Sequence, residues 1–147
     1  MAINTRKVVI GGLAAGVVLN LIDFLSNGVV FADRMRADAN MFKPGLGDQM
    51  AVMDGGAIAT YVAMDFVVGL LLVWTYAAIR PRFGPGAKTA VYVAIVFWIF
   101  GAITTSGFMH MGIMSSGLWF QHALVWLVNL LLAVLAGGMV YTEDSTA

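Results

Sequence analysis

Residues 17–28 read VVLNLIDFLSNG and place a carboxylate, Asp23, inside a long apolar run. The chain around this run has 147 residues, of which 61% are hydrophobic and only 11% are charged. This is too little charge to cover the surface of a water-soluble domain of that length. Apolar runs of about twenty residues or more recur along the chain, and such runs are typical of membrane-spanning helices. The composition therefore predicts an all-α integral membrane protein.

Breaks rich in glycine, proline and serine divide the chain into four spans, each long enough to cross about 30 Å of hydrocarbon. We expect one transmembrane domain, 1–147, folded as a four-helix bundle. The predicted spans are residues 7–32, 56–79, 88–110 and 117–141, with a loop at 33–55. AMDFVVGLLL at 63–72 also parallels LVNLLLAVLA at 127–136, which aligns Asp65 with Asn129 and hints at a duplicated helical hairpin.

Basic residues predict how these helices are oriented. They flank the start of the first span and fill the loop between the second and third spans, while the last loop has none. By the positive-inside rule both termini would be cytoplasmic and the 33–55 loop periplasmic. The expected location is the bacterial inner membrane. The residues that carry this prediction are Arg6, Lys7, Arg80, Arg82 and Lys88.

Small residues recur on one face of each predicted helix. In the first span, spacings of four, four, three and four residues place two glycines and three polar residues on a single stripe. Water expulsion does not drive helices together in lipid, so close backbone approach and interhelical hydrogen bonds must do so. The first stripe also contains a GxxxG motif, which could serve packing within the bundle or contact with another subunit. The predicted packing residues are Gly12, Gly16, Gly69, Gly101, Ala133 and Gly137.

Asp23 and Asp65 are predicted to lie at one depth in the membrane. Asp23 comes about nine residues before the end of the first span and Asp65 about nine after the start of the second, which puts both about 13 Å below one surface. An ionised carboxylate facing lipid costs at least about 2.5–3.5 kcal/mol, so the two should face the interior of the bundle. The predicted polar cluster comprises Asn20, Asp23, Asn27, Asp65, Thr105 and Asn129.

Two interpretations of this cluster stay open. Two close carboxylates do not both ionise readily, so the pair could hold a proton or a cation, as in a small transporter or channel subunit. Alternatively, the polar side chains only hold the helices in register, because interhelical polar bonds are widely used in membrane proteins. We favour the structural interpretation.

Methionine and histidine gather near the predicted periplasmic side. Thioether and imidazole groups suit copper, particularly Cu(I), so a periplasm-facing copper site is one hypothesis. The alternative is that methionine fills irregular gaps where loops pack on helix ends. The candidate ligands are Met109, His110, Met111, Met114 and His122.

The first two spans and the loop that follows them carry a resemblance. VVLNLIDFLSNGVVFADRM at 17–35, taken with YAAIRPRFGPGAKTA at 76–90, resembles a set of short bacterial four-span membrane proteins with an AAIRPRFGPG-type cytoplasmic loop. The resemblance implies the four-span fold. We associate no activity with these proteins, so no functional residue is transferred from them.

No set of residues in the sequence indicates a catalytic site. A phosphate-binding glycine loop, an H-E-x-x-H motif and a serine triad in a recognisable context are all missing, and there is no cysteine. The formal net charge of zero gives no reason to expect a nucleic-acid partner. We therefore expect a non-enzymatic membrane protein without a cofactor. Its predicted partners are lipid and either further copies of itself or other subunits of a larger membrane complex.

Overall fold

The computed structural model describes residues 3–142, and this part of the chain is built from helices. Four spans are long and apolar enough to cross a membrane, and the first of them, Thr5–Val30, joins α1 to a π-helical turn, η1. The predicted all-α, four-span membrane fold is confirmed. The elements are α1 (Thr5–Leu25), η1 (Ser26–Val30), α2 (Ala32–Phe42), α3 (Leu46–Ala51), α4 (Gly55–Phe83), α5 (Ala87–His110) and α6 (Ser116–Val140).

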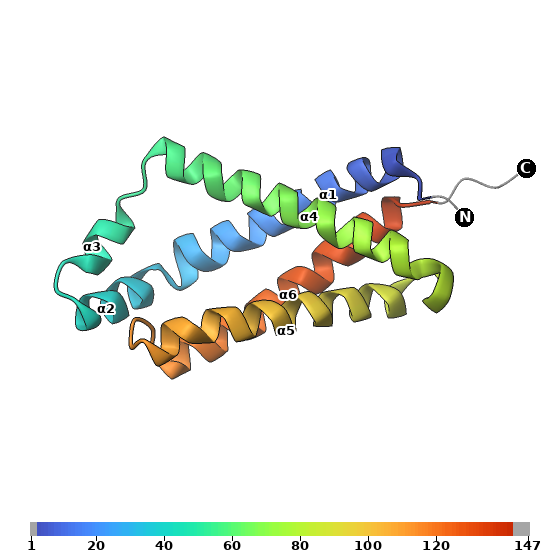
Figure 1. The fold of residues 1–147 in the computed structure, drawn as a ribbon. Coiled ribbons are helices and arrows are strands. Elements are labelled where there is room, and N and C mark those ends of the chain that lie inside the picture. Colours follow the sequence, from blue (N-terminus) through green and yellow to red (C-terminus); the bar gives the residue numbers. More distant parts are fainter. Residues whose placement is uncertain (1–2, 143–147) are drawn as a thin grey trace, which may run out of the picture.

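The helix α1 lies at the centre of the bundle. It packs along α4 on one side and along α6 on the other, and α5 packs mainly on α6 (Figure 1). Figure 1 also shows α4 crossing α1 and diverging from α5 and α6 toward its own N-terminal end. The fully buried apolar side chains come from all four spans and include Leu72, Val93 and Leu130.

Glycines allow α1 and α4 to touch backbone to backbone. A Cβ atom on Gly69 would lie 2.5 Å from the carbonyl oxygen of Gly12 and 2.6 Å from the amide nitrogen of Gly16. No side chain fits into such a contact. The GxxxG stripe of α1 is therefore occupied by α4 of the same chain and is not available to another subunit.

A second glycine contact joins α1 to α6. A Cβ atom on Gly11 would lie 2.7 Å from the carbonyl oxygen of Gly137, and Ala133, one turn away, is completely buried. Gly101 on α5 accommodates the indole of Trp126 on α6, since a Cβ there would overlap the ring. Gly11 was not among the predicted packing residues. Its signal was the adjacent pair Gly11–Gly12, which points small residues toward two different neighbours of α1.

The 33–55 loop is ordered as two short helices, α2 and α3, which we call the cap. The cap lies against the hairpin between α5 and α6, because Asp38 Oδ2 accepts a hydrogen bond from the amide of Ser115 at 2.7 Å and Arg34 donates to Gln121. Within the cap, Asn40 Oδ1 accepts from the amide of Gly47 at 2.7 Å. We call this side of the bundle the cap end.

The opposite side, here called the terminal end, holds residues from both ends of the described chain. The amide of Asn4 donates to the hydroxyl of Tyr141 at 3.4 Å, and Arg80 lies over the Tyr141 ring. The helix α4 continues to Phe83, beyond its predicted end at residue 79. It tolerates Pro81 within its last turn and stops at Gly84, whose φ of +85° departs from helical geometry and favours glycine.

An ion pair makes the cap sensitive to acid. Arg36 lies 2.6 Å from Asp48, and this hydrogen bond and charge lower the pKa of Asp48 below its ordinary value of 3.8. Because the folded-state pKa is the lower one, the pair supports the cap above about pH 4 and loses this effect as the pH falls through the lowered pKa. We expect the distribution of distances between spin labels on α2 and α3 to be narrow at neutral pH and to broaden in acid.

The control for this expectation is Asp48→Asn, which should show the broadened distance at neutral pH and little response to acid. Both side chains of the pair are more than half exposed, so the effect should be modest and should weaken in high salt. A wild-type cap that responds to acid in the same way as the Asp48→Asn cap would contradict the role given to the pair.

Candidate functional site: a polar centre between three helices

Asp23 on α1 lies between one polar residue on α6 and one on α4. The Asn129 side-chain amide donates to Asp23 Oδ1 at 2.9 Å and is also 3.4 Å from the carbonyl oxygen of Leu19. Asn129 is completely buried, whereas Asp23 and Asp65 are half-buried. Asp65, on α4, lies three residues from Val62, and the Val62 carbonyl oxygen is 3.4 Å from the amide nitrogen of Asn20, three residues before Asp23 on α1. We call Asp23, Asp65 and Asn129 the polar centre.

The two carboxylates of the polar centre have no cationic partner within the described residues, where the ion pair of the cap is the one salt bridge. Nor does a hydrogen bond join the Asp23 and Asp65 carboxylates in residues 3–142, and no other described group donates to the Asp65 carboxylate. Asn129 is therefore the side chain that supports Asp23. Asp23 and Asn129 were both predicted to belong to the polar cluster, and the hydrogen bond between them joins these two residues. A carboxylate inside a membrane is expected to face the bundle.

Asn20 and Thr105 have other surroundings. Asn20 donates to the Gly16 carbonyl oxygen at 2.9 Å and reaches the Val62 carbonyl oxygen of α4 at 3.4 Å, so it bridges two helices beside the polar centre. The Thr105 hydroxyl donates to the Gly101 carbonyl oxygen of its own helix at 2.9 Å and accepts from Trp119 at 3.3 Å. Thr105 stays outside the polar centre because α5 packs on α6 and not along α1.

Asn27 and His122 continue the polar path toward the cap end. Asn27 lies one helical turn beyond Asp23, and its buried Oδ1 has no hydrogen-bond partner. The ring of His122 packs on Phe31 with centroids 5.1 Å apart, and its Nε2 is likewise buried without a partner. The Oδ1 of Asn129 is a third such atom. Each buried polar atom left without a partner costs about 1–3 kcal/mol, which marks this seam for a role other than packing.

The π-helical turn η1 aligns these residues with α6. In an α-helix of 3.6 residues per turn, Phe31 would be rotated by about 80° from Asp23, eight residues earlier. The Phe31 amide instead bonds the Ser26 carbonyl oxygen at 2.8 Å, five residues back, and the wider turn returns Phe31 to the side that faces His122. Single π turns inside α-helices are frequent at functional sites. This turn was not predicted from the sequence.

The five candidate copper ligands lie in different surroundings. His122 packs on Phe31 in the α1–α6 seam, and Met114 lines a small cavity of about 30 Å³ together with Met35 and Met50 of the cap. His110 and Met111 are exposed at the end of α5, and Met109 is half-buried. In residues 3–142, no three His, Cys, Asp or Glu side chains group together as metal ligands. Met114 thus serves the packing of the cap on the α5–α6 hairpin.

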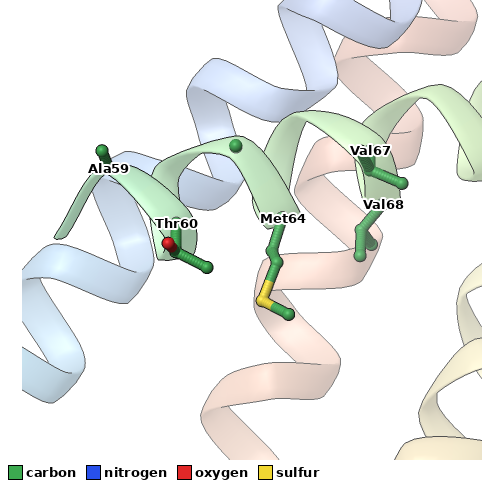
Figure 2. A pocket seen from close by; sticks show the side chains of 6 residues that line it. Ala59, Thr60, Met64, Val67 and Val68 are labelled. Carbon is green, nitrogen blue, oxygen red and sulfur yellow. The ribbon is translucent and has the colours of Figure 1, made fainter. Parts of the chain in front are cut away.

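The cap-end half of α4 has an open face that no other helix in residues 3–142 lines. Its residues are shown in Figure 2, and we call this the bare face. Its one hydroxyl, on Thr60, donates to the Gly56 carbonyl oxygen of the same helix at 2.8 Å, so the face presents an apolar surface. The bare face consists of Ala59, Thr60, Ala63, Met64, Val67 and Val68.

Comparison of the chain with models of known protein families, with curated proteins and with solved structures gave no match.

Proposed function

We propose that this protein is a non-catalytic membrane protein that self-associates through the bare face of α4. The observation that supports the proposal is that the cap-end half of α4 packs on no other helix on that side, although its residues are of the kind that helices use to pack. Ala59 and Ala63 are one turn apart and allow close backbone approach. The other stripe of this kind, Gly12 and Gly16, is already occupied within the chain.

A second copy of the chain is the partner that best fits the bare face. A two-fold axis places the same residues of both copies against each other, and a face of small, uncharged side chains is complementary to itself. In this proposal the protein lies in the bacterial inner membrane with both termini in the cytoplasm, as the basic residues of the terminal end predict. Another membrane subunit, or lipid alone, would give a different outcome in the experiment below.

Cysteine crosslinking tests the self-association. The chain has no native cysteine, so any disulfide must come from an introduced residue. When native membranes are oxidised, we expect most molecules of the Ala63→Cys variant to form a covalent dimer. The reason is that residues near a two-fold axis approach within disulfide distance. The matched control is Val96→Cys on α5, a position that is 62% exposed on another side of the bundle and should remain monomeric.

A second variant, Ala63→Trp, should convert the purified dimer to monomer without unfolding it, as measured by light scattering in detergent. A wild-type monomer, or equal crosslinking at positions 63 and 96, would overturn self-association through this face. Crosslinking of Ala63→Cys to a different membrane protein would instead identify that protein as the occupant.

A further inference from the structure

Between the polar centre and the cap, the seam between α1–η1 and α6 holds two further polar side chains, Asn27 and His122. Asp23 bonds Asn129 at its inner end, and Phe31 packs on His122 at its outer end. Asn27 lies between them, four residues from Asp23 and four from Phe31. At 1.5 Å per residue this stretch of the seam spans about 12 Å. Three of its atoms are buried and have no hydrogen-bond partner among residues 3–142, namely Asn129 Oδ1, Asn27 Oδ1 and His122 Nε2.

The polar centre has the composition of a cation site. Its groups are two carboxylates and an amide oxygen, and oxygen ligands of this kind suit hard cations. The Asn129 amide is completely buried, its nitrogen is used by Asp23, and its oxygen is unused. No Lys or Arg side chain balances the carboxylates within the described residues. Two carboxylates and one amide oxygen are three ligand groups, so a metal ion bound there would complete its shell with backbone oxygens or water.

We propose that Asp23, Asp65 and Asn129 bind a monovalent cation, H⁺ or Na⁺, and that the cation enters from the cap end along the seam past His122 and Asn27. Asp65 and His122 are the titratable groups that face this path from α4 and α6. No described group donates a hydrogen bond to the Asp65 carboxylate, which leaves its oxygens available to the cation. The proposal concerns the interior of one chain and does not depend on self-association through the bare face.

Thermal unfolding and infrared spectroscopy of the full chain in lipid nanodiscs test the polar centre and distinguish the two cations. If the cation is Na⁺, the unfolding midpoint should rise with NaCl, with choline chloride keeping the ionic strength constant, because a bound ligand stabilises the folded state. If it is H⁺, NaCl should have no effect and the spectrum at neutral pH should contain a protonated carboxyl band. Asp65→Asn should remove whichever signal the wild type gives.

The control is Asp33→Asn, which changes an exposed carboxylate on α2 and should keep the signal. Asp65→Asn is preferred to Asp23→Asn because it breaks no hydrogen bond and should fold. Absence of both the NaCl response and the protonated carboxyl would overturn the proposal. So would a signal that persists in Asp65→Asn, because the cation would then bind elsewhere.

Thiol labelling tests the path. Asn27→Cys should react with a charged, water-soluble thiol reagent in nanodiscs, because only the thiolate reacts and thiolates form where water is present. The matched control is Val29→Cys, two residues away on the same turn and 64% exposed on the lipid side, which should react far more slowly. Ser26→Cys, a nearly isosteric change at a buried position, repeats the measurement if Asn27→Cys misfolds. Buried cysteines that label no faster than Val29→Cys would overturn the path.

Discussion

Replacing Gly69 with alanine is expected to lower the free energy of unfolding by about 1–3 kcal/mol, as overpacking in a close-packed interior does. The added Cβ would lie 2.5 Å from the Gly12 carbonyl oxygen and 2.6 Å from the Gly16 nitrogen, and both are backbone atoms. A flexible side chain could move aside, but backbone atoms move only if α1 and α4 separate. Denaturant or thermal unfolding in detergent measures the loss.

Gly107→Ala on α5 is the matched control for this substitution. A Cβ there meets nothing within 4 Å, so the change should be neutral, or stabilising by up to about 1 kcal/mol through helix propensity. Equal stability of Gly69→Ala and Gly107→Ala would show that the α1–α4 contact is looser than described. It would also release the GxxxG stripe for contact with another subunit.

The second large effect is expected from Asn129→Leu. This change removes the Asn129 hydrogen bond to the Asp23 carboxylate, to which no other described side chain donates, and leaves that carboxylate half-buried. Hydrogen bonds to charged groups contribute about 1.5–3 kcal/mol, so we expect a loss near that range, although interhelical bonds in membranes can be weaker. Asp23→Leu should also impair folding, because it leaves the buried Asn129 amide without its carboxylate partner.

A double-mutant cycle separates this bond from other effects. The loss in Asp23→Leu/Asn129→Leu should be clearly smaller than the sum of the single losses, since both single changes break the same bond. Thr104→Val is the control, because its hydroxyl is exposed and bonds only the Phe100 carbonyl oxygen of its own helix at 2.8 Å. If Asn129→Leu and Thr104→Val have the same free energy of unfolding, the Asp23–Asn129 hydrogen bond does not stabilise the fold.

The stability and cation experiments address different properties of the same residues. Loss of stability in Asn129→Leu is expected whether the polar centre binds an ion or only joins helices. The response to Na⁺ or to pH is expected only from ion binding. Asp65 is the informative position, because it lies beside Asp23 but supports no hydrogen bond of its own.

Local features of the sequence were enough to predict the four spans and the face of each helix. The apolar run length gives the spans, and the 3.6-residue period places Gly12, Gly16 and Asp23 on one stripe. Counting residues from the helix ends placed Asp23 and Asn129 in one predicted cluster, and a hydrogen bond of 2.9 Å joins them. The prediction that Thr105 lies beside them did not take into account which helices pack together. The spacing of residues along one helix does not determine which neighbouring helix a face contacts.

Features that depend on two surfaces at once were decided only by the tertiary structure. The sequence by itself determined that Asp23 points into a helical bundle in a membrane, because exposing a carboxylate to lipid is energetically costly. Three features follow from how helix surfaces fit together. They are the contact between Gly11 and Gly137, the π turn that brings Phe31 to His122, and the bare face of α4. That fit depends on side-chain volumes on both helices, which residue spacing along one helix does not contain.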